Sequence, residues 1–243
     1  MKSYALDQKE QNWEEWFAKR GGQPFGAQQV MRWLYVHHEF DPLKYSNIAL
    51  PFRQPLVFDF DWSLPEIDSI LRSSDDSEKV LIATKDGRFI ESVIMTSENR
   101  ITLCVSSQVG CRMGCTFCQT GKMGFSRNLS SGEILAQLVL ANLRLKERGL
   151  DRKVSNVVFM GMGEPLDNYD KVIQACRIML DPKLFGLSKN KVTISTSGLI
   201  PEIQRLGQDL PVSLAISLHS ADEEQRSRMM PINRKYSLAE LKK

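Results

Sequence analysis

The chain has 243 residues, of which 42% are hydrophobic and 25% are charged, a composition typical of a globular protein with a sizeable core. No apolar signal stretch begins it, and its longest apolar runs are too short to cross a bilayer, so we expect a cytoplasmic protein without a membrane partner. An odd number of cysteines, five, argues against a disulfide framework and for reduced thiols. Residues 1–98 carry a net charge of −5 and residues 99–243 one of +8, an imbalance that suits an anionic partner but is weak evidence for one.

The first 62 residues are predicted to form a small helical domain. Residues 12–17 place aromatic side chains on one helical face, and Gly21 and Gly22 end that helix. A second helix is expected over residues 24–35. The aromatic residues could stack on bases, but such a stripe at helical spacing usually belongs to a core, which we favour. The adjacent His37 and His38 are interpreted as surface or cap residues.

Residues 63–98 are predicted to be a β-hairpin that connects two domains. Its strands, residues 79–84 and 89–95, flank an Asp86-Gly87 turn. Glu91 lies among apolar neighbours in the second strand. The pattern alone indicates a solvated carboxylate on an edge strand.

Strands and helices alternate from residue 99 to the end, which predicts an α/β domain with a parallel sheet. The expected strands are residues 101–106, 154–160, 191–196 and 211–218. The expected helices are residues 134–146, which follow a Ser130–Glu133 capping box, 168–180 and 201–206. We interpret the domain as part of an α/β barrel, in which reactive groups gather at the C-terminal ends of the strands.

Three of the five cysteines, Cys111, Cys115 and Cys118, lie within one short loop after the first of these strands. Structural zinc sites have four protein ligands, and the other cysteines and histidines are scattered, so a zinc site is the less favoured alternative. Three thiolates on a 4Fe-4S cluster would leave one iron open for a substrate or cosubstrate. This spacing, with Phe117 before the last cysteine, resembles the radical S-adenosylmethionine (SAM) superfamily.

Three further motifs follow the later strands directly. Gly161-Met-Gly-Glu-Pro165 permits close backbone approach and offers the Glu164 carboxylate to an ammonium group, while Ser195-Thr-Ser-Gly198 and Ser217-Leu-His-Ser220 offer hydroxyls and an imidazole. Each is often an ordinary loop. On one rim with the cysteine loop, they indicate a site that surrounds SAM.

Six motifs together resemble the dual-specificity ribosomal and transfer RNA adenine-C2 methyltransferases of the radical SAM superfamily, from about residue 24 to the end. They are Cys104-Val-Ser-Ser-Gln-Val-Gly-Cys111, Gly124-Phe-Ser-Arg-Asn-Leu, Gly161-Met-Gly-Glu-Pro, Val192-Thr-Ile-Ser-Thr-Ser-Gly, Leu214-Ala-Ile-Ser-Leu-His and Met230-Pro-Ile-Asn-Arg-Lys-Tyr. The resemblance implies a 4Fe-4S cluster and SAM as cofactors, 23S rRNA and in some members tRNA as substrates, a separate electron donor and a monomeric enzyme.

The resemblance also implies a role for each matching residue. The metal ligands are Cys111, Cys115 and Cys118; the SAM-binding residues are Gly163, Glu164, Ser195, Ser217, Leu218 and His219. Glu91 is implied as the proton acceptor, against the solvated role that its pattern indicates. Cys104, otherwise a candidate buried strand thiol, is implied as the thiol that resolves a protein adduct as a disulfide. Cys176 is expected to be a core residue.

In the family, one SAM methylates a cysteine near the C-terminus, a deoxyadenosyl radical from a second SAM activates that methyl group, and the carbon radical adds to adenine C2. This sequence has no cysteine after Cys176, and four strands stand where the family has six. A Ser237–Glu240 capping box opens a helix three residues before the end. We therefore expect a truncated chain that is inactive alone. Adenine-C8 methylation and a non-catalytic remnant that binds cluster, SAM or RNA are the alternatives.

Overall fold

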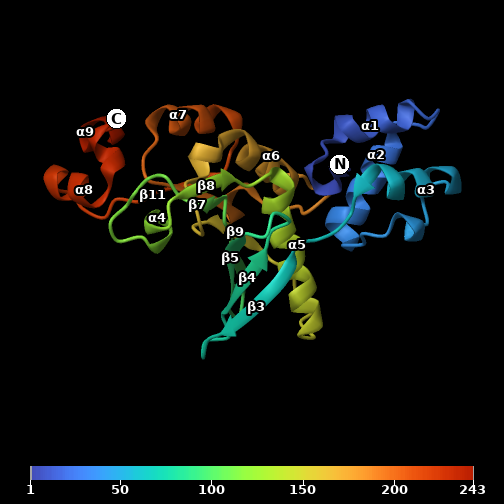
Figure 1. Ribbon diagram of the computed structural model, residues 1–243, viewed down its shortest axis with the longest axis horizontal. Coiled ribbons are helices and arrows are strands. Elements are labelled where there is room, and N and C mark those ends of the chain that lie inside the picture. Colours follow the sequence, from blue (N-terminus) through green and yellow to red (C-terminus); the bar gives the residue numbers. More distant parts are fainter. Residues whose placement is uncertain (1, 243) are drawn as a thin grey trace.

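The computed structural model describes residues 2–242, and a seven-stranded mixed sheet forms its centre (Figure 1). The strand order is β11-β10-β9-β6-β5-β4-β3, with β6, β9, β10 and β11 parallel and β3 to β6 antiparallel. The strands are β3 (Glu66–Arg72), β4 (Glu78–Ala83), β5 (Phe89–Thr96), β6 (Ile101–Cys104), β9 (Asn156–Phe159), β10 (Val192–Thr196) and β11 (Ser213–Ile216). The four parallel strands are those that the sequence predicts, so the α/β class is confirmed.

The helices between the parallel strands also form where they are expected. They are α5 (Ser131–Glu147), α6 (Tyr169–Leu180) and α7 (Ile200–Asp209). The Ser130 side chain accepts a hydrogen bond from the Glu133 N–H, and the Glu133 carboxylate accepts one from the Ser130 N–H, so the predicted capping box is present. Because α5 is buried along most of its length, it forms the centre of the hydrophobic core.

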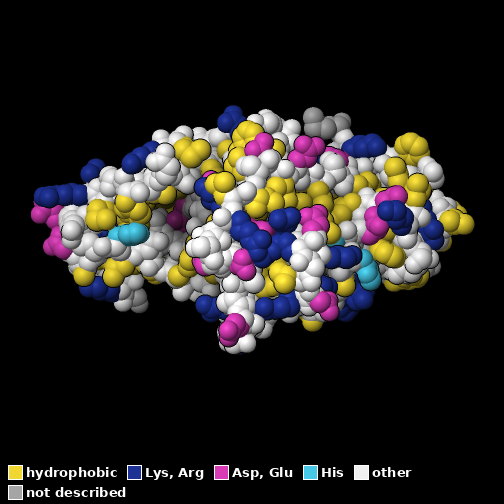
Figure 2. All heavy atoms as spheres, turned by 90° about the horizontal axis from the view of Figure 1, so that it is seen from below, with side chains coloured by type: hydrophobic (Ala, Val, Ile, Leu, Met, Phe, Trp, Pro, Cys, Tyr) yellow, Lys and Arg dark blue, Asp and Glu magenta, His cyan; other side chains and the backbone are white. Residues whose placement is uncertain are grey.

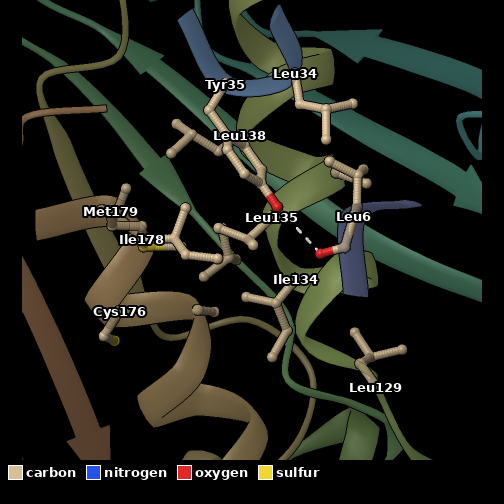
Figure 3. Close-up of a cluster of buried hydrophobic side chains, with 14 of the residues drawn as sticks. Leu6, Leu34, Tyr35, Leu129, Ile134, Leu135, Leu138, Cys176, Ile178 and Met179 are labelled. Carbon is tan, nitrogen blue, oxygen red and sulfur yellow. Dashed lines mark hydrogen bonds between the residues drawn. The ribbon is translucent and has the colours of Figure 1, made fainter. Parts of the chain in front are cut away.

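Figure 3 shows how side chains from distant segments meet on α5. Ile134, Leu135 and Leu138 of this helix are buried with Tyr35 from the N-terminal region and Cys176 from α6. The Tyr35 hydroxyl donates a hydrogen bond of 3.1 Å to the Leu6 carbonyl, which satisfies its one polar atom in this apolar setting. Cys176 is fully buried, which confirms the prediction that it is a core residue.

The N-terminal region is helical, as predicted, and lies at one end of the molecule (Figure 1). Its helices are α1 (Glu10–Ala18), α2 (Phe25–Arg32), a π-helical turn (Trp33–His37) and α3 (Leu50–Asp59), with 3-10 turns at Ala5–Asp7 and Pro42–Lys44 and a two-residue strand pair, β1 (Ser3–Tyr4) and β2 (Phe60–Asp61). Trp13, Trp16 and Phe17 are buried, so the aromatic stripe is core rather than a base-stacking surface. His38 caps the π-helical turn with a φ of 54°, as a cap residue was expected to do.

The predicted hairpin is present as β4 and β5, but it is not isolated from the parallel sheet. β5 pairs with β6, and a further strand, β3, pairs with β4. These antiparallel strands extend below the body of the molecule beside α5 (Figure 1). The division into domains at residues 62 and 98 stays a prediction, and one hydrogen-bond ladder crosses the second boundary.

Several short elements complete the described chain. They are β7 (Gln108–Gly110), α4 (Gln119–Lys122), β8 (Phe125–Asn128), α8 (Glu223–Met229), α9 (Leu238–Leu241) and 3-10 turns at Pro165–Asn168, Lys189–Lys191 and Pro231–Arg234.

Within residues 2–242 no helix combines the length and apolarity that crossing a bilayer requires. Side chains of both charges are interspersed over the face shown in Figure 2, with Lys and Arg most concentrated near its middle. Lys and Arg therefore do not form one continuous patch on this face.

Candidate active site

A two-stranded ribbon holds the base of the cysteine loop. β7 and β8 pair antiparallel on either side of the loop, and the Cys111 N–H donates a hydrogen bond of 2.9 Å to the Gly124 carbonyl. Gly110 has a φ of 76°, and a β-carbon there would lie 1.9 Å from the Gly124 carbonyl oxygen. Glycine is therefore required at this position for the backbones to approach closely.

The cysteine loop and the three strand-end motifs line one cavity of about 330 Å³. Of the expected site residues, Cys111, Cys115, Cys118, Gly163, Glu164, Ser195, Ser217 and His219 border it, together with Met113, Phe117, Phe159, Met160, Gly161, Thr196, Ser197 and Met230. Leu218, Glu91 and Cys104 do not border it, and Leu218 is 47% exposed. The cavity therefore joins the predicted metal ligands to most of the predicted SAM residues.

The cysteine loop brings three thiols to the cavity. Cys111, Cys115 and Cys118 are free thiols, and burial raises the pKa of Cys111 to about 11 and also raises that of Cys115. Among residues 2–242 no three His, Cys, Asp or Glu side chains are arranged to hold one ion. Three thiolates suit a 4Fe-4S group, in which each would bind a different iron, whereas a structural zinc ion takes four protein ligands.

Glu164 is buried and fixed by the backbone around it. Its carboxylate accepts hydrogen bonds from the Ser197 N–H at 2.8 Å and the Leu166 N–H at 3.2 Å. Burial raises its pKa, and these hydrogen bonds oppose the rise. Both oxygens are thus already engaged, so an ammonium group would use their remaining lone pairs.

Gln108, which the sequence analysis did not select, joins the cysteine ribbon to the Glu164 loop. Its side chain is fully buried; Oε1 accepts from the Glu164 N–H at 2.9 Å, and Nε2 donates to Asn128 and Asp167 at 2.8 and 2.7 Å. Gly163 has a φ of 99°, and a β-carbon there would lie 2.5 Å from the Gln108 side chain. No local sequence pattern marks Gln108, because its partners lie in β8 and in the loop after β9, which are distant in sequence.

An aromatic pair borders the cavity. The Phe117 and His219 rings are 3.9 Å apart at an angle of 34°. Phe117 belongs to the cysteine loop, and His219, with a φ of 57°, follows β11. This pair provides flat apolar surface beside the cysteines, where a purine ring can stack.

Glu91 and Cys104 lie outside the cavity but on the same face of the sheet as Ser195. Cys104 pairs in register with Val93 and with Val158, and partners in register share a face. Because side chains alternate along a strand, Glu91 shares the face of Val93. Thr193 pairs with Val158 and so lies on that face, and Ser195, two residues further along the same strand, lies on it too.

Glu91 is half-exposed and pairs with Lys79 across the hairpin at 3.0 Å. Its backbone carbonyl accepts a hydrogen bond of 2.6 Å from the Ser106 hydroxyl, which links it to the segment that leads to the cysteines. No disulfide forms, since all five cysteines are free. The Cys104 side chain is partly buried.

Comparison with known proteins agrees with this geometry. The family model of the radical SAM superfamily matches residues 105–243. The chain belongs to the radical SAM superfamily. Members use a 4Fe-4S cluster and SAM, which are therefore the cofactors of this chain. A model described as the ribosomal RNA large subunit methyltransferase N-terminal domain matches residues 5–58.

A solved relative covers almost the whole chain. It is the crystal structure of a radical SAM methyltransferase from Sphaerobacter thermophilus, with 36% sequence identity and a TM-score of 0.90 over 98% of this chain and 70% of the relative. At the level of the family, the chain is a methyltransferase. The expected fold class and cofactors are thereby confirmed, while the roles of individual residues stay predictions.

Proposed function

We propose that this chain belongs to an enzyme that methylates C2 of adenine in 23S rRNA, with tRNA as a second substrate class. The observation that carries the proposal is the convergence of three free cysteines with the strand-end loops on one cavity, in a chain that also matches the ribosomal RNA methyltransferase N-terminal model. The same proposal places the protein in the cytoplasm as a monomer that receives electrons from a separate donor.

Each of the expected site residues would have a role that follows from its position. Cys111, Cys115 and Cys118 would hold the cluster, which when bound supplies the electron that cleaves SAM. Glu164 and the Ser195 and Ser217 loops would orient the methionine part of SAM, and the Phe117–His219 pair would stack on its adenine. Further along the same face, Glu91 would accept the proton that leaves C2 when the methyl carbon attaches, and Cys104 would resolve the protein adduct.

Iron content and RNA products together test the proposal. Anaerobically reconstituted protein should hold about four irons per chain. Cys111→Ala, Cys115→Ala and Cys118→Ala should each abolish this content, whereas Cys176→Ala, which changes a core thiol in α6, should not. One zinc ion per chain in place of iron would overturn the cluster assignment.

The identity of the methylated base is tested by mass spectrometry of RNA from cells with and without the complete gene. Loss of 2-methyladenosine from 23S rRNA is the expected result. Loss of 8-methyladenosine would assign the C8 reaction instead. Unchanged RNA from cells without the gene, despite a loaded cluster, would favour a non-catalytic role.

A further inference from the structure

An arginine behind the cysteine loop is buried without an acidic hydrogen-bond partner. Arg226 of α8 is fully buried, and its guanidinium donates to the carbonyls of Ser197 at 2.7 Å, Leu218 at 3.2 Å and Ser217 at 3.2 Å, and to the Asn233 side-chain oxygen. These are neutral acceptors from the loops after β10 and β11 and from the turn after α8. Among the described residues, none of its hydrogen bonds reaches a carboxylate.

No hydrogen-bonded carboxylate therefore neutralises the positive charge of this buried guanidinium. Buried charges in proteins are normally paired, and arginine does not lose its proton in proteins. The carboxylate of Glu223 acts on it from a distance, but the oxygens of Glu223 accept hydrogen bonds from Asn233 at 2.7 Å and the Leu238 N–H at 3.0 Å. Burial lowers the pKa of Arg226, and the charges of Glu223 and Cys115 raise it.

Arg226 also lies close enough to Cys115 to interact with it electrostatically. The segment that carries it contacts the cysteine loop, since the Thr116 N–H donates a hydrogen bond of 2.9 Å to the Met229 carbonyl. Met230 borders the cavity, as do Ser197 and Ser217, whose carbonyls the guanidinium binds. The Arg226 side chain thus binds both strand-end loops from a helix that also contacts the cysteine loop.

We propose that Arg226 is the buried counter-charge of the cluster and stabilises its reduced form. This inference rests on the proposed cluster ligands. A cluster held by three thiolates is negatively charged, and reduction adds one electron from an external one-electron donor, which makes it more negative by one charge. In a low-dielectric interior a fixed positive charge favours the more negative state, because little solvent screens the attraction. Arg226 is thus a positioning residue that also makes the cluster easier to reduce.

Redox titration of three variants tests the charge. Arg226→Gln removes the charge and keeps polar atoms, Arg226→Lys keeps the charge, and Arg228→Gln is the control, since Arg228 is exposed on the same helix and pairs with Glu224. Each reconstituted protein is titrated with dithionite in the presence of mediators, and the reduced cluster is followed by electron paramagnetic resonance. At a fixed potential, Arg226→Gln should lower the ratio of reduced to oxidised cluster at least threefold. Arg226→Lys and Arg228→Gln should stay near the wild-type ratio.

The outcomes separate this inference from the proposed function. Wild-type protein that fails to bind about four irons overturns the proposed function itself. An Arg226→Gln protein that holds the wild-type iron content with an unchanged ratio overturns the role of Arg226 alone, as does an Arg226→Lys protein that shifts as far. If Arg226→Gln does not hold the cluster, Glu223→Gln replaces it. That change removes a negative charge that acts on Arg226 and should raise the ratio, and an unchanged ratio overturns the inference.

Discussion

Glu91 is the residue whose environment bears most directly on the proposed chemistry. It pairs with Lys79 through one carboxylate oxygen, Oε1, so the Lys79 ammonium group would compete with the substrate for this carboxylate. In an enzyme that methylates adenine C2, Glu91→Gln should leave SAM cleavage at the wild-type rate and lower formation of methyladenosine by about 10²-fold or more, because the amide does not accept the C2 proton. Chromatography of deoxyadenosine and of nucleosides from the same reaction measures both.

Glu66→Gln provides the matched control, since Glu66 is an exposed carboxylate of β3 in the same sheet. It should leave both products unchanged. Wild-type methylation by the Glu91→Gln enzyme would remove Glu91 from the mechanism.

At the level of residues, local patterns identified the cysteines and the strand-end motifs, because each motif is continuous in sequence. Glu91 was selected by family resemblance, since its strand pattern indicated a solvated side chain. Gln108 and Arg226 were not predicted at all. Their importance comes from hydrogen-bond partners in other segments of the chain, and Arg226 lies in a helix whose charged sequence looks fully exposed.

The β7–β8 ribbon provides a matched pair of glycines. Gly110 and Gly124 have nearly equal φ angles of 76° and 74°, but a β-carbon at Gly110 meets the Gly124 carbonyl while one at Gly124 meets nothing within 4 Å. Gly124→Ala should cost about 1 kcal/mol from backbone strain. Gly110→Ala should cost several times more and lower the iron content, because the ribbon must open. Urea unfolding and iron assays measure both effects; equal costs would show that backbone contact at Gly110 is unimportant.

Arg127 of β8 connects three elements. Its guanidinium binds both oxygens of Asp86 in the hairpin turn at 2.7 and 2.8 Å, and also binds Glu133 of α5. The Arg127 hydrogen bonds hold the pKa of Asp86 well below its usual range. A lowered pKa stabilises the folded state above pH 3.8, the ordinary value for the carboxyl group, and this contribution is lost as the pH falls further.

Asp86→Asn should therefore lower the free energy of unfolding at pH 7 by about 1 kcal/mol, a value that allows for screening at this partly exposed pair. The difference from wild type should shrink as the pH is lowered below about 3.8. Urea unfolding between pH 3 and pH 7 measures it. Arg88→Met is the control, since Arg88 lies 3.6 Å from Asp86 in an exposed pair and should change little. A difference that grows at low pH would contradict the ion-pair explanation.

At the level of elements, α5 with its capping box, α6, α7 and the four parallel strands were predicted, whereas α3 and several short strands were missed. β7 and β8 have three and four residues, too few for alternation to be recognised. β3 was missed because a register shift between Ile67 and Ser69 interrupts its alternation. These strands are stabilised by their partners rather than by their own composition.

At the level of the whole molecule, Asp7 attaches the N-terminal region to the catalytic part. One of its carboxylate oxygens accepts from the Gly132 N–H at 2.7 Å and the Ser131 hydroxyl at 3.2 Å, at the positive end of α5. Asp7→Ala should lower stability by about 1–2 kcal/mol. All four tryptophans lie in the first 62 residues, so their fluorescence follows that region while circular dichroism follows the whole chain. In Asp7→Ala, the fluorescence transition in urea should precede the dichroism transition.

Asp41→Ala is the control, since Asp41 caps only a short local turn through the Leu43 N–H. Its two transitions should stay together. Coincident transitions in Asp7→Ala would show that other contacts suffice to join the two parts.

The sequence allowed the class of the fold to be predicted, because alternation of strands and helices is a local signal. It did not show that the hairpin continues the parallel sheet. That continuity depends on the pairing of β5 with β6, and strand partners are chosen by tertiary packing rather than by either strand alone.

The continuous sheet from β3 to β11 sets the distance between Glu91, the proposed base, and Ser195, a proposed SAM-binding residue. β5, which carries Glu91, is three strand spacings from β10, which carries Ser195, or about 14 Å along the sheet. An atom within hydrogen-bonding distance of Glu91 is therefore out of reach of the Ser195 side chain. The SAM-binding residue Ser195 and the base Glu91 would therefore contact their partners at separate places on one face of the sheet.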